Sequence, residues 1–149
     1  MKRARIGMPT PSATRVRITA AGHRFVAETH AGAPRTVAAF MALLPYRQKL
    51  IHVRWSGEAV WVPLGDFDLG VGFENHTCYP SAGDILFYPG GHSETELLVA
   101  YGACSFASRM GPLAGNHFLT VVEGRERLAA LGRTVLWEGA QDIVFETME

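Results

Sequence analysis

The sequence has few cysteines and no metal-binding or redox pattern around them. Cys78 and Cys104 are the two cysteines of the chain, and neither has a second cysteine or a histidine at the spacing of a metal or redox motif. We therefore expect both to be buried structural thiols. Because no secretory apolar segment follows the basic start, we also expect a reducing, cytoplasmic compartment.

The sequence also lacks a net charge, a long apolar run and a phosphate-binding loop. A formal net charge of +0 provides no general attraction to nucleic acid. No apolar stretch approaches the roughly 20 residues that a membrane span requires. The glycines at 65, 70 and 72 do not form a nucleotide-binding fingerprint after a strand. We expect neither a nucleic acid nor a membrane as a partner.

What is present is the composition of a folded globular protein. The 149 residues are 48% hydrophobic and 19% charged, which suits one domain with its own core. Lys2, Arg3 and Arg5 make the N-terminus basic, and we interpret residues 1–13 as a disordered tail. Residues 14–149 are then expected to form a single domain.

Most of the domain has the pattern of short β-strands. Val16 and Ile18 alternate with polar residues, and Ser56-Gly57-Glu58 is a turn signal between two apolar runs. Segments of this kind, rich in β-branched and aromatic residues, are predicted as strands at 15–19, 24–28, 50–55, 59–62, 85–88, 97–101, 118–122, 135–137 and 143–145. The stretch from 63 to 80 has no sustained period and is predicted as a long loop.

Two helices complete the prediction. Pro34 suits a first helical position, and Val37, Phe40, Met41 and Leu44 recur at helical spacing before Pro45. A second short helix is predicted at 125–131. The fold class is therefore mainly β, a closed barrel of about eight strands capped by two short helices.

Several segments, in order along nearly the whole chain, resemble cyclophilins. Ala33-Pro34-Arg35-Thr36-Val37 is similar to their first helix start, and Gly83-Asp84-Ile85-Leu86 to one of their strands. Gly115-Asn116-His117-Phe118, followed by Val122-Glu123-Gly124, resembles the segment before their closing helix. The resemblance implies a cyclophilin-like barrel.

Other segments resemble more closely a family of uncharacterised bacterial cyclophilin-like proteins. These segments are Glu74-Asn75-x-Thr77, Tyr88-Pro89-Gly90 and Leu113-Ala114-Gly115-Asn116. Cucumopine synthase, an opine-cyclising enzyme, is remotely similar to that group. This resemblance implies proton transfer during ring formation or opening at nitrogen.

The active-site residues of a prolyl isomerase are only partly matched in this sequence. By the resemblance, His117 falls at the histidine of the proline pocket and Glu96 falls near a glutamine of the cyclophilins. Arg54 is only loosely like their arginine, and Trp55 to Asp66 replace a phenylalanine-methionine-x-glutamine segment. Peptidyl-prolyl isomerase activity is therefore the least favoured interpretation.

Most residues capable of chemistry lie between Phe73 and His117, which indicates a polar pocket. On one strand, His92, Glu94 and Glu96 would share a face, directed either into a cleft or to water. Glu94 and Glu96 would then lie roughly 6 to 7 Å apart and raise each other's pKa. The catalytic candidates are Glu74, Glu94, Glu96 and His117, and the ligand-binding candidates are Trp55, Asn75, Tyr88, His92, Tyr101 and Asn116.

Structural roles remain open for several candidates. Glu74 could cap loop amides, and Tyr88, Tyr101 and His117 could be satisfied at the barrel end. A metal site of His92, Glu94 and Glu96 with His117 or His76 lacks the second histidine of cupin motifs. We therefore expect no metal and no cofactor.

The sequence predicts an acidic cleft that binds a small nitrogen-bearing metabolite. If the protein is an enzyme, we expect a metal-independent acid/base lyase, hydrolase or isomerase, acting by cyclisation, ring opening or isomerisation. The alternative is a non-catalytic ligand-binding protein or accessory subunit. Barrel edges and aromatic residues would allow a homodimer.

Overall fold

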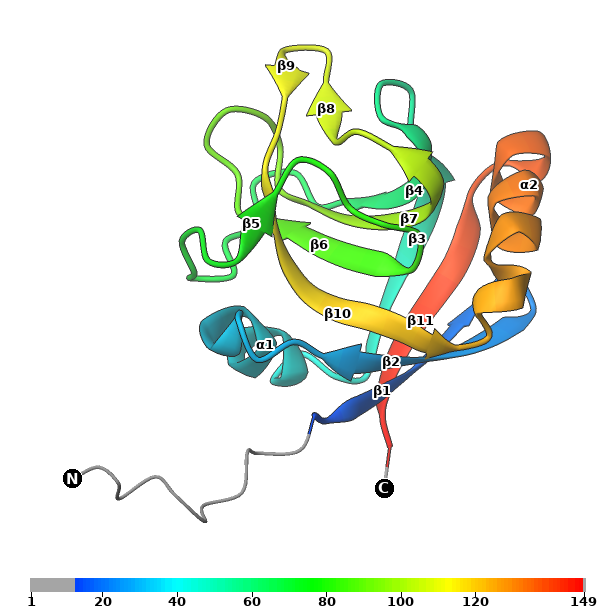
Figure 1. The fold of residues 1–149 in the computed structure, drawn as a ribbon, viewed down its shortest axis with the longest axis horizontal. Helices are drawn as coiled ribbons and strands as arrows, with labels where there is room; N and C mark the ends of the chain where they lie inside the picture. The colour runs from blue at the N-terminus through cyan, green and yellow to red at the C-terminus, as the bar shows by residue number, and fades with distance from the viewer. Residues whose placement is uncertain (1–12, 149) are drawn as a thin grey trace.

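Eight antiparallel strands close into a barrel in the computed structural model, which describes residues 13–148 (Figure 1). The order around the barrel is β2-β1-β11-β3-β4-β7-β6-β10, and β10 pairs with β2 to close it. The strands are β1 (Arg15–Ala20), β2 (His23–Thr29), β3 (Tyr46–His52), β4 (Gly57–Pro63), β6 (Asp84–Tyr88), β7 (Glu96–Cys104), β10 (Gly115–Glu123) and β11 (Gln141–Thr147). The predicted fold class is confirmed.

Alternation along the strands fills the barrel interior. In β1, Val16, Ile18 and Ala20 are buried while the residues between them are more exposed. Because neighbouring side chains of a strand point to opposite faces, one face of each strand supplies the core. The β1–β2 turn uses left-handed backbone at Ala21 and Gly22, with φ of 49° and 81°.

Helix α1 (Pro34–Met41) closes one end of the barrel. Its Phe40 is 1% exposed and packs edge-on against Phe118 and Phe145, with centroid distances of 5.0 and 5.1 Å. The predicted helix is confirmed, although it ends at Met41 and Leu44 lies outside it.

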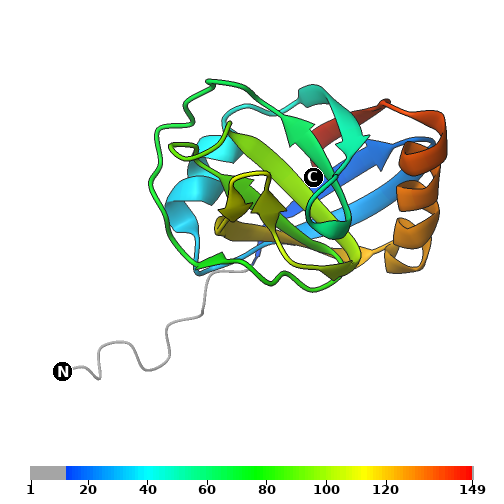
Figure 2. The same ribbon diagram turned by 90° about the horizontal axis from the view of Figure 1, so that it is seen from above.

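Helix α2 (Leu128–Glu138) follows a short 3-10 helix, η2 (Arg125–Arg127), and lies at the end opposite to α1 (Figure 2). The predicted strand at 135–137 is therefore wrong, and the helix predicted at 125–131 continues through it. Leu128, Leu131 and Val135 are buried at helical spacing, and this stripe outweighs the β propensity of the run that follows. Gly132 in the same helix makes room for the ring of Tyr101, which a side chain at that position would strike.

A second hydrophobic cluster covers the outer face of β4, β6 and β7. Residues of these strands that alternate with the barrel core belong to it, and Phe106 and Leu113 from the following segment cover them. The cluster consists of Ala59, Leu86, Tyr88, Leu98, Phe106 and Leu113. Two short strands absent from the sequence prediction, β8 (Ala107–Ser108) and β9 (Gly111–Pro112), form a hairpin beside it. A further short strand, β5 (His76–Thr77), pairs with β10 within the predicted loop.

The two cysteines are free thiols, but neither belongs to the fully buried core. Cys78 and Cys104 are both half-buried, so the prediction of buried thiols is corrected for their degree of burial. Burial raises the pKa of Cys104 to about 11. Cys104 packs against the outer cluster.

The predicted N-terminal tail lies almost entirely outside the described residues, which begin at 13. Neither helix within 13–148 has the length and apolar character needed to cross a bilayer.

Candidate functional site

His92, Glu94 and Glu96 do not share a strand, which corrects the sequence prediction. Strand β7 begins only at Glu96, and the segment before it is a loop. The hydroxyl of Tyr88 accepts hydrogen bonds from the backbone N–H groups of His92 and Ser93, at 3.0 and 3.1 Å. Tyr88 itself is 2% exposed, so its visible role is to hold this loop.

Glu94 lies in the same loop and points away from Glu96. Its carboxylate oxygen accepts a hydrogen bond from the backbone N–H of Gly65 at 2.9 Å. The side chain is exposed, and its bond to Gly65 joins the 90–95 loop to the segment after β4. The two glutamates therefore differ in environment although they are two residues apart.

Glu96 is an acid buried in the barrel wall. It is 6% exposed and stands between Pro63 of β4 and Tyr88 of β6 in the sheet. Among residues 13–148, no group donates a hydrogen bond to its carboxyl or forms an ion pair with it. Burial, and secondarily the charge of Glu94, raises the pKa of Glu96 to about 8.

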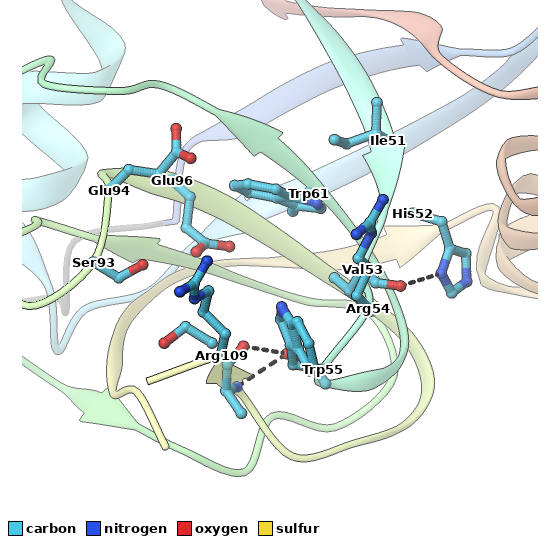
Figure 3. A pocket seen from close by; sticks show the side chains of 13 residues that line it. Ile51, His52, Val53, Arg54, Trp55, Trp61, Ser93, Glu94, Glu96 and Arg109 are labelled. Carbon is cyan, nitrogen blue, oxygen red and sulfur yellow. Dashed lines mark hydrogen bonds between the residues drawn. The ribbon is translucent and has the colours of Figure 1, made fainter. Parts of the chain in front are cut away.

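Glu96 lines a pocket of about 210 Å³ on the outside of the barrel wall. The other walls come from the end of β3 and the turn after it, from Trp61 of β4, and from the β8–β9 hairpin. Figure 3 shows Trp55, Trp61 and Arg109 beside the carboxyl of Glu96, and Arg54 beyond the ring of Trp61. The pocket therefore combines two indole rings, two guanidinium groups and one buried acid.

Glu74 lies in a separate network at the start of α1. One carboxylate oxygen accepts hydrogen bonds from the backbone N–H and the hydroxyl of Thr36, at 2.6 and 2.7 Å. Asn116, which is fully buried, accepts a hydrogen bond from the Glu74 N–H and donates to the Thr36 hydroxyl. Burial alone would raise the pKa of Glu74, but the bonds from Thr36 and Arg35 lower it overall.

His117 is in a third location, paired with Asp84. Its Nε2 lies 3.2 Å from a carboxylate oxygen of Asp84 and 2.8 Å from the Thr120 hydroxyl. Burial would raise the pKa of Asp84, but its bonds to His117 and to the Ser81 N–H lower it overall. Asn75 donates to the His117 carbonyl at 2.8 Å and thereby fixes the adjoining loop.

Tyr101 is directed toward α2 and away from the pocket. Its hydroxyl is 2.8 Å from Nε2 of His52, whose Nδ1 lies 2.8 Å from the Val53 carbonyl. In Figure 3 the ring of His52 likewise points away from the pocket centre.

The structure thus divides the ten candidates among several places. Trp55, Glu94 and Glu96 line the pocket, and Tyr88 adjoins Glu96 in the sheet. The remaining six lie outside its lining: Glu74, Asn75, His92, Tyr101, Asn116 and His117. Within the described part of the chain, no three histidine, cysteine, aspartate or glutamate side chains gather in a way that could hold a metal ion.

Trp61, Arg54 and Arg109 are among the pocket residues that the sequence candidates did not include. Trp61 alternates with Val60 and Val62, and this pattern was a signal that it faces away from the barrel core. Arg54 enters the sequence prediction only through its loose likeness to the isomerase arginine. Arg109 had no signal, because the hairpin that carries it was not predicted.

Comparison with known families agrees with the barrel geometry. The model of the family described as "Protein of unknown function (DUF3830)" matches residues 16–147. The chain belongs to the DUF3830 family. Its barrel confirms the predicted likeness to an uncharacterised cyclophilin-like group. No curated protein matches the DUF3830 chain in sequence.

Solved structures similar to this DUF3830 protein are cyclophilin-like barrels. McbB in complex with tryptophan superposes with a TM-score of 0.63 at 18% identity, over 89% of this chain and 44% of McbB. The DUF3830 chain therefore spans less than half of McbB. The solution structure of the hypothetical protein AF2241 from Archaeoglobus fulgidus gives 0.62 at 16% identity, over 96% and 100% of the two chains.

A cyclophilin-type peptidyl-prolyl cis-trans isomerase from Cryptosporidium parvum is also similar. It gives a TM-score of 0.56 at 15% identity, over 92% of the DUF3830 chain and 99% of the isomerase. At these identities the likeness shows the fold alone.

Proposed function

We propose that this DUF3830 protein binds a small nitrogen-bearing metabolite in the outer-wall pocket, where Glu96 exchanges a proton with the ligand nitrogen. The observation that carries the proposal is the carboxyl of Glu96, which is 6% exposed, lines that pocket and has no partner in the described part of the chain. A buried ionisable group without a protein partner is costly, and such groups concentrate at functional sites.

The raised pKa suits proton transfer near neutral pH. With a pKa of about 8, Glu96 is mostly protonated at neutral pH and can act as a general acid. When it meets an unprotonated amine, its O–H bond breaks and an N–H bond forms, which leaves a carboxylate beside an ammonium group. Since an adjacent positive charge lowers a carboxyl pKa, the bound cation stabilises the ionised form of Glu96.

The two tryptophans favour a flat or cationic ligand. Trp55 is 57% exposed and Trp61 is half-buried, so both indoles can contact a molecule in the pocket. Indole faces attract aromatic rings and cations. The similar barrel of McbB was solved with tryptophan, and this supports an aromatic amine as a probe.

Titration calorimetry with tryptamine tests the proposal. Free tryptamine is already an ammonium ion at neutral pH, so the same carboxylate–ammonium pair forms when Glu96 gives its proton to the buffer, about one proton for each molecule bound. The observed heat should therefore vary with the ionisation enthalpy of the buffer for the wild type and stay constant for Glu96→Gln. Glu138→Gln, on an exposed part of α2, is the matched control and should behave as the wild type does.

A binding heat that is independent of the buffer in the wild type would overturn the role of Glu96. Catalysis is separated from simple binding by incubating amines, amino acids and lactams with the protein in deuterated water. Deuterium incorporation or ring opening that is lost in Glu96→Gln supports an enzyme. Binding without any such change favours the non-catalytic alternative.

A further inference from the structure

Two guanidinium groups stand beside the pocket. Arg54 follows β3, and Arg109 lies in the β8–β9 hairpin, so they reach the pocket from separate segments. Across residues 13–148, neither side chain takes part in an ion pair or a side-chain hydrogen bond. Both are exposed, and both are shown around the pocket in Figure 3.

The two segments that carry these arginines are fixed to each other by Ser56. Its hydroxyl donates to the carbonyl of Ala107 and accepts from the N–H of Ala107, both at 3.0 Å. Its carbonyl accepts from the N–H of Ser105 at 2.9 Å. Because Ser56 is 4% exposed, these bonds are shielded from water and hold the hairpin base against the turn after β3.

The charged groups of the pocket indicate that the ligand carries one carboxylate group. At neutral pH, Arg54 and Arg109 contribute two positive charges, Glu94 contributes one negative charge, and Glu96 is mostly neutral. The excess of one positive charge matches a carboxylate better than a phosphate dianion. A guanidinium group also presents paired N–H donors that fit the two oxygens of a carboxylate.

We propose that Arg54 and Arg109 bind the carboxylate of the ligand, so that the pocket takes an amino acid and not a simple amine. This inference deepens the proposed function and rests on it for the contact between the ligand amine and Glu96. In this arrangement the amine meets Glu96, the carboxylate meets the arginines, and a flat side chain lies against Trp55 or Trp61. The volume of about 210 Å³ is below the roughly 300 Å³ at which drug-sized pockets begin, as expected for a small ligand.

Calorimetry with three matched probes tests the carboxylate site: tryptophan, tryptamine, which lacks the carboxylate, and indole-3-propionate, which lacks the amine. We expect the wild type to bind tryptophan about tenfold or more tighter than tryptamine, since a charge-assisted bond contributes about 1.5 to 3 kcal/mol. Arg54→Gln and Arg109→Gln should each weaken tryptophan and indole-3-propionate by about tenfold and leave tryptamine unchanged.

Arg24→Gln is the matched control, because Arg24 is exposed on β2 and does not line this pocket. It should bind all three probes as the wild type does, and circular dichroism should show that every variant is folded. Equal affinity of the wild type for tryptophan and tryptamine would overturn the carboxylate site. Inorganic phosphate displacing indole-3-propionate more effectively than acetate does would also overturn it.

The probes keep the two proposals apart. Indole-3-propionate reports on the arginines without an amine, and tryptamine reports on Glu96 without a carboxylate. If the arginine variants change indole-3-propionate binding while Glu96→Gln leaves tryptamine heats unchanged, the carboxylate site stands and the proton exchange at Glu96 fails.

Discussion

Glu96 is a residue whose burial costs stability. Its neutral form is preferred in the folded protein, because water cannot solvate the carboxylate and no neighbour within the described residues compensates it. A side chain kept at such a cost is well suited to a ligand that supplies the missing partner. The cost itself can be measured.

The stability of the protein should fall as pH rises through the window between the unfolded and folded pKa values of Glu96. Its pKa increases from an ordinary 4.5 to about 8 on folding, so between these values only the unfolded chain releases the proton. Relative to Glu96→Gln, the wild type should lose on the order of 4 kcal/mol between about pH 5 and about pH 9. Urea unfolding across this range, with Glu138→Gln as the control, measures the difference, and parallel profiles for wild type and Glu96→Gln would contradict it.

Helix α1 depends on a residue far away in the chain for its first turn. Ala33 precedes the helix and has no side chain that could cap it, and the carboxylate of Glu74 accepts the Thr36 N–H instead. Exposed N–H groups at a helix start need such an acceptor. Glu74 therefore connects the long loop after β4 to the helix that closes one end of the barrel.

Removing this cap should destabilise the protein. We expect Glu74→Ala to lower the free energy of unfolding by about 1 to 3 kcal/mol, because a partly buried N–H and hydroxyl lose their acceptor. Glu74→Gln keeps one acceptor oxygen and should cost less. Urea denaturation measures both variants. Loss of turnover in Glu74→Gln with unchanged stability would instead support the catalytic role predicted from the sequence.

The Asp84–His117 pair joins β6 to β10 and should govern resistance to acid. The lowered pKa of Asp84 contributes stability that is present above its ordinary value of 3.8 and is lost as pH falls through the folded value. In His117→Ala that pKa should rise, so acid unfolding should begin at a higher pH. A fluorescence-monitored acid titration measures the midpoint, with His76→Ala, on exposed β5, as the control. Identical midpoints for wild type and His117→Ala would show that the pair contributes nothing.

At the scale of the whole molecule, local sequence patterns predicted most of the strands and helices correctly. The alternation in β1 and the proline and apolar spacing of α1 are short-range features, and each agrees with the structure. The turn predicted at 56–58 lies earlier, at 53–56, and Gly57 already begins β4. Val135, Leu136 and Trp137 misled the prediction because their β propensity is local, whereas the burial of Leu128 and Leu131 against the barrel depends on tertiary packing. The order of the strands around the barrel is a property of long-range pairing, which no single local pattern predicts.

The site was harder to predict because it depends on which face of a strand is covered by loops. Glu96 was expected to point into a cleft or to water. It points outward but is covered by loops, a possibility that alternation cannot distinguish. Glu74 and His117 both belong to the motifs of the resemblance, but they contact different residues. Glu74 accepts a hydrogen bond from Thr36, and His117 pairs with Asp84. The proposed homodimer stays a prediction.

The placement of the pocket on the outer wall separates two demands on this protein. The barrel interior is filled with apolar side chains, and a helix covers each end, so this core contributes most of the stability of the fold. The turn after β3 and the β8–β9 hairpin contribute no residues to this core. Replacing these two segments with other sequences should change which ligand binds while the barrel keeps its structure. The protein is therefore a suitable scaffold for engineering new binding specificities.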